Sequence, residues 1–334
     1  MSGTSALRTR WVRRPPATGG AVLATGVLSV GLHLAGYEVL SRIALALACA
    51  AWLGLVADVA VRLLWVPGPW EPARAGSPTG LTPVAASAVL GVRVSLLGLH
   101  RLAEALLALA LALWVGLVYP VLRRWERRRP GAVFLGCVAT QGISALGAVL
   151  AAATDVAWLA HLALVLFWLG LVLYLVGLWR FDPRQVLTGA GDHWIAGGGL
   201  AVSALAGSRL VAAAHRGPYL WNDDDNGVLR AATVALLVLT LAWSCVLLVA
   251  EALRPRLGYD ALRWATVFAL GMTAAATLSV ASSPGVPWLR GPGRVLLWIA
   301  VAVWCVVLAG AARAVARGLR PPGEAEGVRP RAPR

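Results

Sequence analysis

The side chains that could do chemistry in this chain lie inside apolar segments, and most of them are neutral. Hydroxyl and N–H groups can solvate an anion without holding it so firmly that it cannot leave. A cation pathway would more often show rings of Asp or Glu, and a proton pump a relay of acids, and the sequence has neither pattern. The polar residues therefore favour an anion pathway, with these candidate lining groups: Thr25, Ser29, Thr140, Gln141, Ser144, Ser203 and Thr273.

Two arginines, Arg93 and Arg209, lie within apolar segments of the same small-residue type. A guanidinium group there would raise the local concentration of an anion. The alternative is that these side chains extend to the membrane interface or pair with acids such as Glu104. A second ionisable group surrounds the first predicted external turn and is expected to stay in water: His33, Glu38 and Arg42. Arg93 and Arg209 are therefore the candidate anion-attracting residues.

Other chemical signals in the chain are weaker. The acidic run Asp223–Asp225 could bind a divalent cation, but a solvated loop that caps a helix is the simpler interpretation. His193 could sense pH at a pore mouth, and an interfacial residue beside the helix cap Asp192 is the simpler alternative. The sequence has no P-loop, HExxH, GxSxG or paired-cysteine zinc pattern. We therefore expect no ATP-driven transport by this chain alone, no enzyme activity and no metal site.

Ten apolar segments must position these residues. The chain is 59% hydrophobic and 13% charged, with a mean hydropathy of +0.74. A bilayer core needs roughly 20 apolar residues per helix, whereas barrel strands would be shorter and would alternate in polarity. The sequence therefore predicts an all-α polytopic membrane protein, with spans near 19–34, 38–65, 82–99, 102–122, 131–153, 156–179, 193–214, 228–252, 261–282 and 292–316.

The ten segments alternate between two compositions. Odd-numbered segments are rich in Gly, Ser, Thr and Ala, whereas even-numbered segments are dominated by Leu, Val and Trp. Small residues allow close helix approach and can line a wet cavity, while large apolar residues suit lipid. We therefore expect five helical hairpins, with odd helices forming an inner pore ring and even helices an outer ring. A weak repeat supports this arrangement, although its residue types are common in lipid-facing helices; it begins at Trp52, Trp114 and Trp168, with Trp243 and Trp304 in corresponding places.

The basic charge of the chain follows its predicted topology. The formal net charge is +15, there is no lysine, and most arginines fall in or beside alternate loops, most densely at 123–129. By the positive-inside rule this places both termini in the cytoplasm of a multi-pass cell-membrane (inner or plasma membrane) protein and argues against nucleic-acid binding. The expected organisation is an Arg-rich cytoplasmic N-terminus at 1–18, a transmembrane domain at 19–317 and a disordered cytoplasmic tail at 318–334.

Two short motifs resemble a known family. The segment Leu23–Ser29 is similar to the first-helix Gly-Thr-Gly-x-x-Ser pattern of the tellurite-resistance/dicarboxylate transporter family, with Ala24 in place of the first Gly. The segment Trp264–Met272 resembles that family's ninth-helix signature, which usually contains Phe-Pro-Leu-Gly-Met. The family includes slow-type anion channels, malate transporters and sulfite exporters. The resemblance implies five hairpins around a pore, often a homotrimer of independent pores, and no cofactor.

The resemblance also implies a phenylalanine gate on the ninth helix, and Phe268 is the matching position. A bulky apolar ring in a pathway lined by small residues would obstruct hydrated ions and favour dewetting. The alternative is that the Phe268 ring simply packs between helices. Ala269 replaces the usual proline, so the helix kink expected there should be milder or absent.

These observations predict a membrane channel or transporter for small anions, either inorganic anions or C4-dicarboxylates, through a central pore occluded by a phenylalanine. Its partners are then small anions and the lipid bilayer. The alternative within transport is a proton-coupled dicarboxylate carrier or a sulfite exporter. A third class, a membrane-embedded enzyme or sensor with a lipid-like ligand, would instead use the acidic and histidine residues around 192–193 and 223–225. No residue indicates tellurite as a substrate.

Overall fold

The structure is a computed structural model, and every element in its described part is helical. It describes residues 17–65, 78–123, 131–184, 186, 191, 193–214, 223–253, 259–282 and 286–319. The predicted Arg-rich N-terminus and the predicted disordered tail lie almost entirely outside these residues. Asp192 also lies outside them, as do the side chains of 223–225.

Ten α-helices form within the described residues, and each coincides with one predicted span to within about five residues at either end. Three short 3₁₀ turns, η1 (Pro78–Leu81), η2 (Gly131–Phe134) and η3 (Pro287–Leu289), precede α5, α7 and α13. The helices are α2 (Ala17–Leu34), α3 (Glu38–Trp65), α5 (Thr82–Leu96), α6 (His100–Arg123), α7 (Leu135–Thr154), α8 (Ala157–Arg180), α10 (Trp194–Ala214), α11 (Asp223–Leu253), α12 (Arg263–Ala281) and α13 (Arg290–Leu319).

The lengths of these helices match a bilayer. Eight of the described helices are long and apolar enough to cross a membrane, and two shorter apolar helices lie at Gly19–Leu34 and Thr82–Leu96. The 3₁₀ turn η1 runs directly into α5, so the helical run there extends from Pro78 to Leu96. The prediction of an all-helical, multi-pass membrane protein is therefore confirmed.

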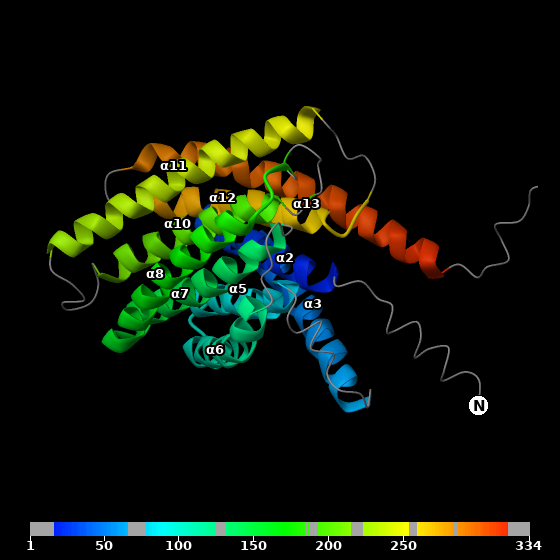
Figure 1. The fold of residues 1–334 in the computed structure, drawn as a ribbon, viewed down its shortest axis with the longest axis horizontal. Helices are drawn as coiled ribbons and strands as arrows, with labels where there is room; N and C mark the ends of the chain where they lie inside the picture. Colours follow the sequence, from blue (N-terminus) through cyan, green and yellow to red (C-terminus); the bar gives the residue numbers. More distant parts are fainter. Residues whose placement is uncertain are drawn as a thin grey trace, which may run out of the picture.

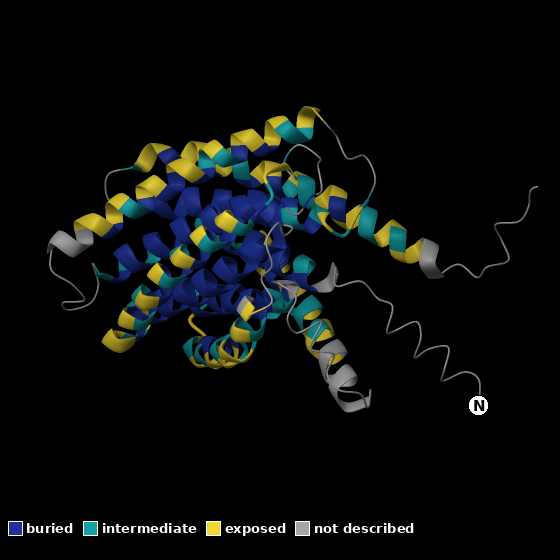
Figure 2. Cartoon of the chain, in the orientation of Figure 1, coloured by how far each residue is buried: buried dark blue, intermediate teal, exposed yellow. Residues whose placement is uncertain are grey.

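Burial divides the helices into two groups. In α7 and α12 every residue of the most apolar 18-residue window is buried, and in α10 89% are, whereas in α3, α6, α8, α11 and α13 only 17–39% are buried. α2 and α5 are buried along most of their length (Figure 2). We call α2, α5, α7, α10 and α12 the inner helices and the other five the outer helices. Most of the exposed large apolar side chains lie on the outer helices, where lipid can solvate them.

The packing order of the helices is regular. Each inner helix packs against the outer helix that follows it in the chain. The inner helices also pack against one another in the order α2, α5, α7, α10, α12 and back to α2, so that they form a closed cycle. In Figure 1, α11 and α13 lie along the upper edge and α6 at the lower edge, with α10, α12, α2 and α5 between them. Their Gly, Ala and Ser residues allow this close approach. The first and ninth predicted spans, far apart in sequence, are therefore neighbours in space.

Indole N–H groups join three outer helices to the next inner helix in this cycle. Each donates a hydrogen bond to a hydroxyl group, and the pairs are Trp52 with Ser87 (3.0 Å), Trp114 with Thr140 (2.9 Å) and Trp304 with Thr25 (3.0 Å). The third pair joins α13, the last described helix, to α2, the first. Trp168, which begins another copy of the sequence repeat, instead packs edge-on against Phe167. Three of the five repeated tryptophans thus share one interhelical role.

The Trp304 hydrogen bond provides a test of this role. Trp304→Phe keeps an aromatic ring but removes the donor to Thr25, so we expect the free energy of unfolding in detergent to fall by about 1 kcal/mol. Trp168→Phe is the matched control, because Trp168 occupies the corresponding place in its own outer helix and its exposed ring packs against Phe167. Equal losses in the two variants would show that the hydrogen bond contributes nothing beyond ring packing.

Candidate functional site

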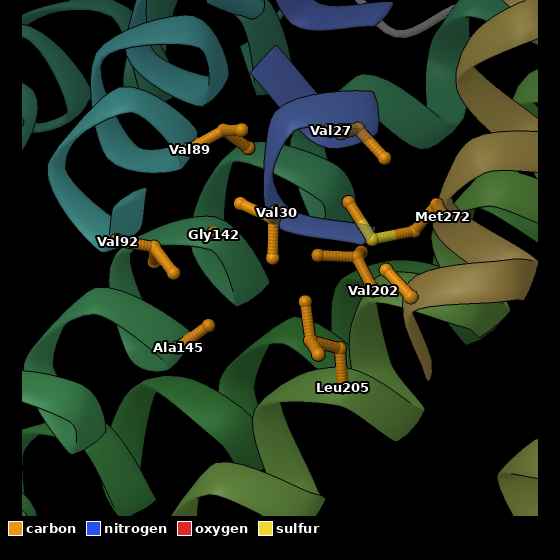
Figure 3. A pocket seen from close by; sticks show the side chains of 10 residues that line it. Val27, Val30, Val89, Val92, Gly142, Ala145, Val202, Leu205 and Met272 are labelled. Carbon is orange, nitrogen blue, oxygen red and sulfur yellow. The ribbon is translucent and has the colours of Figure 1, made fainter. Parts of the chain in front are cut away.

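A cavity lies where the five inner helices face one another. Each inner helix contributes two lining residues three positions apart: Val27 and Val30, Val89 and Val92, Gly142 and Ala145, Val202 and Leu205, Met272 and Ala275 (Figure 3). Residues at this spacing share one face of a helix, so all five helices present the same kind of face to the cavity. Its free space is about 10 Å³, close to the room that one water molecule needs.

The lining of the cavity is apolar throughout. The side chains around it are aliphatic, apart from the thioether of Met272 and the hydrogen of Gly142 (Figure 3). No side chain in the lining offers a charge or a strong hydrogen-bond donor to an ion. Sequence reasoning missed these residues because valine pairs at helical spacing also suit a lipid-facing helix. One signal in the sequence could have found them. Three of the lining pairs begin two residues after a polar residue of an inner helix, namely Thr25, Ser87 and Thr140.

The seven predicted lining groups are absent from the set that lines this cavity. On α2 and α7 their polar atoms bond to outer helices instead. The Ser29 hydroxyl donates to the Ser41 carbonyl on α3 (2.7 Å), and the Ser144 hydroxyl donates to the Ala163 carbonyl on α8 (2.6 Å). Thr25 and Thr140 accept the indole N–H groups described above. These hydroxyls therefore link inner to outer helices in this conformation, and their role in lining the pathway stays a prediction.

The Gln141 side chain also points towards an outer helix, but only one of its two polar atoms has a hydrogen-bond partner among the described residues. Its Nε2 donates to the Phe167 carbonyl on α8 (3.0 Å), whereas its Oε1 is buried without a hydrogen-bond partner among the described residues. Gly170 on α8 makes room for it, because a Cβ there would lie 2.7 Å from Gln141 Nε2. Gln141 is therefore held against the α8 backbone, on the side of α7 that faces its own hairpin partner.

The remaining two predicted lining groups also have protein partners. Ser203 donates to the Gly199 carbonyl within α10 (2.8 Å). Thr273 donates to the Ala269 carbonyl within α12 (2.8 Å) and lies 3.3 Å from the Ser244 hydroxyl on α11. A buried hydroxyl that has no water nearby donates its hydrogen bond to a neighbouring backbone carbonyl. This explains why the hydroxyls here bond within a helix or between helices.

Phe268 lies beside the cavity on α12. It is four residues before Met272, and residues four apart lie on one helix face about one turn apart, so Phe268 is one turn nearer the N-terminal end of α12. Its side chain is only 2% exposed. The ring packs directly against Gly198 of α10, which itself lies four residues before Val202. α12 is continuous through Ala269.

Arg93 is completely buried near the C-terminal end of α5. Its Nη2 donates to Glu38 Oε1 (2.7 Å) and its Nε to the Ser41 hydroxyl (2.8 Å), both at the start of α3. Its Nη1 has no hydrogen-bond partner among the described residues. The partner acid is therefore Glu38, whereas Glu104 pairs with the exposed Arg101 (3.2 Å).

Glu38 is the centre of a larger charge cluster. Besides Arg93, its carboxylate lies 2.7 Å from His33 Nδ1 and 3.0 Å from Arg42 Nε. The Glu38 side chain is 37% exposed and that of Arg42 67%, whereas that of Arg93 is 0% exposed. The cluster thus extends from the surface to a buried inner-helix cation. Sequence reasoning grouped His33, Glu38 and Arg42 correctly but missed that Arg93, 55 residues away from Glu38, completes the group.

Arg209 occupies a different position from Arg93. It lies on α10 four residues after the cavity residue Leu205, on the same helix face and one turn nearer the C-terminal end, and it is partly exposed. Next to it, the Ser208 hydroxyl lies 2.8 Å from the Ser279 hydroxyl on α12. Along the inner helices, Phe268 and Arg209 are therefore on opposite sides of the cavity.

The weaker sequence signals do not assemble a second site in the described part of the chain. His193 is buried, and its Nδ1 accepts a hydrogen bond from the Gly191 N–H (3.3 Å). No group of three or more His, Cys, Asp or Glu residues that could hold a metal ion occurs among the described residues. The four cysteines are free thiols.

Comparison with known proteins points to one family. The family model described as voltage-dependent anion channel matches residues 13–312, which cover nine of the ten described helices in full and most of the tenth. A comparison with curated proteins finds no match. The matched range includes both motifs that resemble the tellurite-resistance/dicarboxylate transporter family, to which the voltage-dependent anion channels belong. The chain is therefore a member of the voltage-dependent anion channel family.

Proposed function

We propose that this protein conducts small anions across the membrane through a pathway along the axis of the five inner helices, and that Phe268 occludes it. The observation that carries the proposal is the cavity between all five inner helices, with the Phe268 ring one turn away on the same face of α12. Membership of an anion channel family supports the substrate class. In this view the inner helices are the pore ring and the outer helices face lipid.

The described conformation is the closed one in this proposal. The cavity has room for about one water molecule, and its lining is aliphatic. A narrow apolar segment in a pore stops ions because water leaves it, and an ion cannot enter without its hydration shell. Both the ring and the aliphatic lining therefore hold the pathway shut until Phe268 moves.

Charge on the inner helices supports anions over cations. Arg209 is on the cavity face and partly exposed, so we assign it the role of attracting anions to one mouth of the pathway. Arg93 is a second attractor, but Glu38 neutralises it in this conformation. The hydroxyls and the amide singled out from the sequence become lining groups only if the inner helices rotate on opening.

We propose the orientation in the membrane from the arginine distribution. Both termini then lie in the cytoplasm, and the N-terminal ends of the inner helices face inward in the plasma membrane. Phe268 is in the cytoplasmic half of the pathway, and Arg93 and Arg209 are in the outer half. A homotrimer of independent pores is the assembly that the family resemblance favours.

The aliphatic lining predicts which anions pass best. The free energy needed to move an ion out of water rises steeply with its charge, and no charged side chain in the cavity offsets it. We therefore expect doubly charged malate to pass slower than nitrate by at least roughly tenfold. Between ions of equal charge, the larger one loses less solvation free energy on leaving water, so nitrate should pass faster than chloride. Flux through the purified protein in liposomes, with each anion in turn, tests this order.

The same experiment separates the channel from a proton-coupled carrier. A carrier would take up malate or sulfite with saturation and would be driven by a pH gradient, and the Glu38–His33 pair next to Arg93 is the one observation that favours it. Malate uptake faster than nitrate and dependent on the pH gradient would replace the channel proposal. Absence of flux for every anion, in protein shown to be folded and inserted, would remove both.

A further inference from the structure

Three consecutive glycines of α10, at positions 197–199, are each in contact with an aromatic ring from a different helix. A Cβ built on Gly197 would lie 3.1 Å from Trp243 of α11, and one on Gly199 would lie 3.2 Å from Tyr174 of α8. A Cβ on Gly198 would lie 2.8 Å from Cδ1 of Phe268 on α12 and closer still to its Cε1. The backbone of α10 is thus in direct contact with three rings, one of which is the proposed gate.

The three contacts differ in how much room remains. Real Cβ atoms essentially never approach another heavy atom to less than 3.0 Å, so a methyl group at 198 requires the Phe268 ring to shift. At 197 and 199 the corresponding contacts exceed 3.0 Å, and small movements of Trp243 and Tyr174 relieve them. The space beside Gly198 is therefore occupied by the Phe268 ring and admits no further atom.

We propose that Gly198 is the seat of the gate: its missing side chain leaves the space in which the Phe268 ring rests when the pathway is occluded. This inference rests on the proposed function, because it assigns a positioning residue to the Phe268 gate. Residues 198 and 268 lie one turn from the cavity on neighbouring inner helices, four residues before Val202 and Met272 respectively. The ring therefore reaches across the boundary between α10 and α12 at one end of the cavity.

The helix that carries Phe268 indicates how the ring leaves its seat. α12 is one continuous helix from Arg263 to Ala281, and it contains no proline. Sharp helix kinks occur at proline, at Gly/Ser pairs, at a π-bulge or where a group is inserted into the helix, and Ala269 is none of these, so it offers no hinge. The ring then leaves its seat by rotation of the Phe268 side chain about its own bonds, and the seat on α10 sets how stable the closed rotamer is.

Gly198→Ala tests the seat. The methyl group fills the ring's place and shifts Phe268 towards its rotated position, so nitrate flux in liposomes should rise by roughly fivefold or more over wild type. Gly197→Ala is the matched control, since it adds the same methyl group one residue away and meets Trp243 instead; its flux should stay near wild type. In Phe268→Ala, which lacks the ring, adding Gly198→Ala should change the flux little.

The outcomes of this experiment are distinguishable. Two results would contradict the role proposed for Gly198 and leave Phe268 as the gate. In the first, Phe268→Ala raises flux but Gly198→Ala does not. In the second, Gly198→Ala has the same effect with and without the Phe268 ring. If no variant conducts any anion, the proposed function itself fails. Should Gly198→Ala not fold alone, recovery of folding in the Phe268→Ala/Gly198→Ala double variant would support competition for one space. Failure of both to fold would overturn the inference.

Discussion

Phe268→Ala is expected to raise nitrate flux through the reconstituted protein by roughly tenfold or more, which corresponds to a barrier lower by about 1.4 kcal/mol. The ring is buried beside a cavity that holds about one water molecule. Its removal joins that cavity to the space against Gly198 and widens the apolar segment, so that water and a hydrated anion can enter. Flux is measured in liposomes across chloride, nitrate, malate and sulfite, and the order of selectivity should persist.

Phe167→Ala is the matched control for this experiment. Phe167 is also buried, but it lies on outer helix α8. Both substitutions remove a large ring from the interior and should lower the free energy of unfolding by about 3–5 kcal/mol. Only the loss of Phe268 should increase flux. If the two variants lose similar stability and neither changes flux, Phe268 is a packing residue and the gate proposal is wrong.

Glu38→Gln is expected to destabilise the protein far more than Arg93→Met does. Glu38 neutralises a fully buried guanidinium, and removing one partner of a buried pair typically costs 3–5 kcal/mol. Because Glu38 is partly exposed, we expect about 2–3 kcal/mol. In Arg93→Met, Glu38 keeps His33, Arg42 and water as partners, so the loss should be about 1 kcal/mol. Unfolding of each variant in detergent measures the difference.

The Glu38 variant also tests whether Arg93 can attract anions. With its carboxylate partner gone, the Arg93 guanidinium gains most from a bound anion, so added nitrate should stabilise Glu38→Gln more steeply than wild type. Glu104→Gln is the control, because its partner Arg101 is almost fully exposed and the pair contributes little. Equal losses in Glu38→Gln and Arg93→Met, without any anion dependence, would assign Arg93 a purely structural role.

The membrane-spanning helices could be predicted from the sequence because the thickness of the bilayer fixes their length and the hydrocarbon fixes their composition. Each of these is a local property that a window of about 20 residues reveals. The same holds for the contrast between small-residue and bulky segments, which matches the inner and outer helices in burial. The motif around Phe268 pointed to the family for a similar reason, since it is contiguous in sequence.

Tertiary structure alone decided where the side chains of these helices point. On α2 the Ser29 hydroxyl bonds to an outer helix, whereas Val27 lines the cavity. On α7 the Ser144 hydroxyl bonds to an outer helix, whereas Ala145 lines the cavity. Which face turns inward depends on how neighbouring helices pack, and therefore on residues far away in the chain.

The contacts around Phe268 and Arg93 have the same origin. The Phe268 ring meets Gly198, 70 residues earlier, and Arg93 meets Glu38, 55 residues earlier, instead of the nearer Glu104. The sequence by itself determined the membrane fold, because hydrophobic burial in a bilayer acts on each segment separately. The closed cycle of inner helices decided the site, because hydrogen bonds and ring contacts form only between groups that packing brings within a few ångströms.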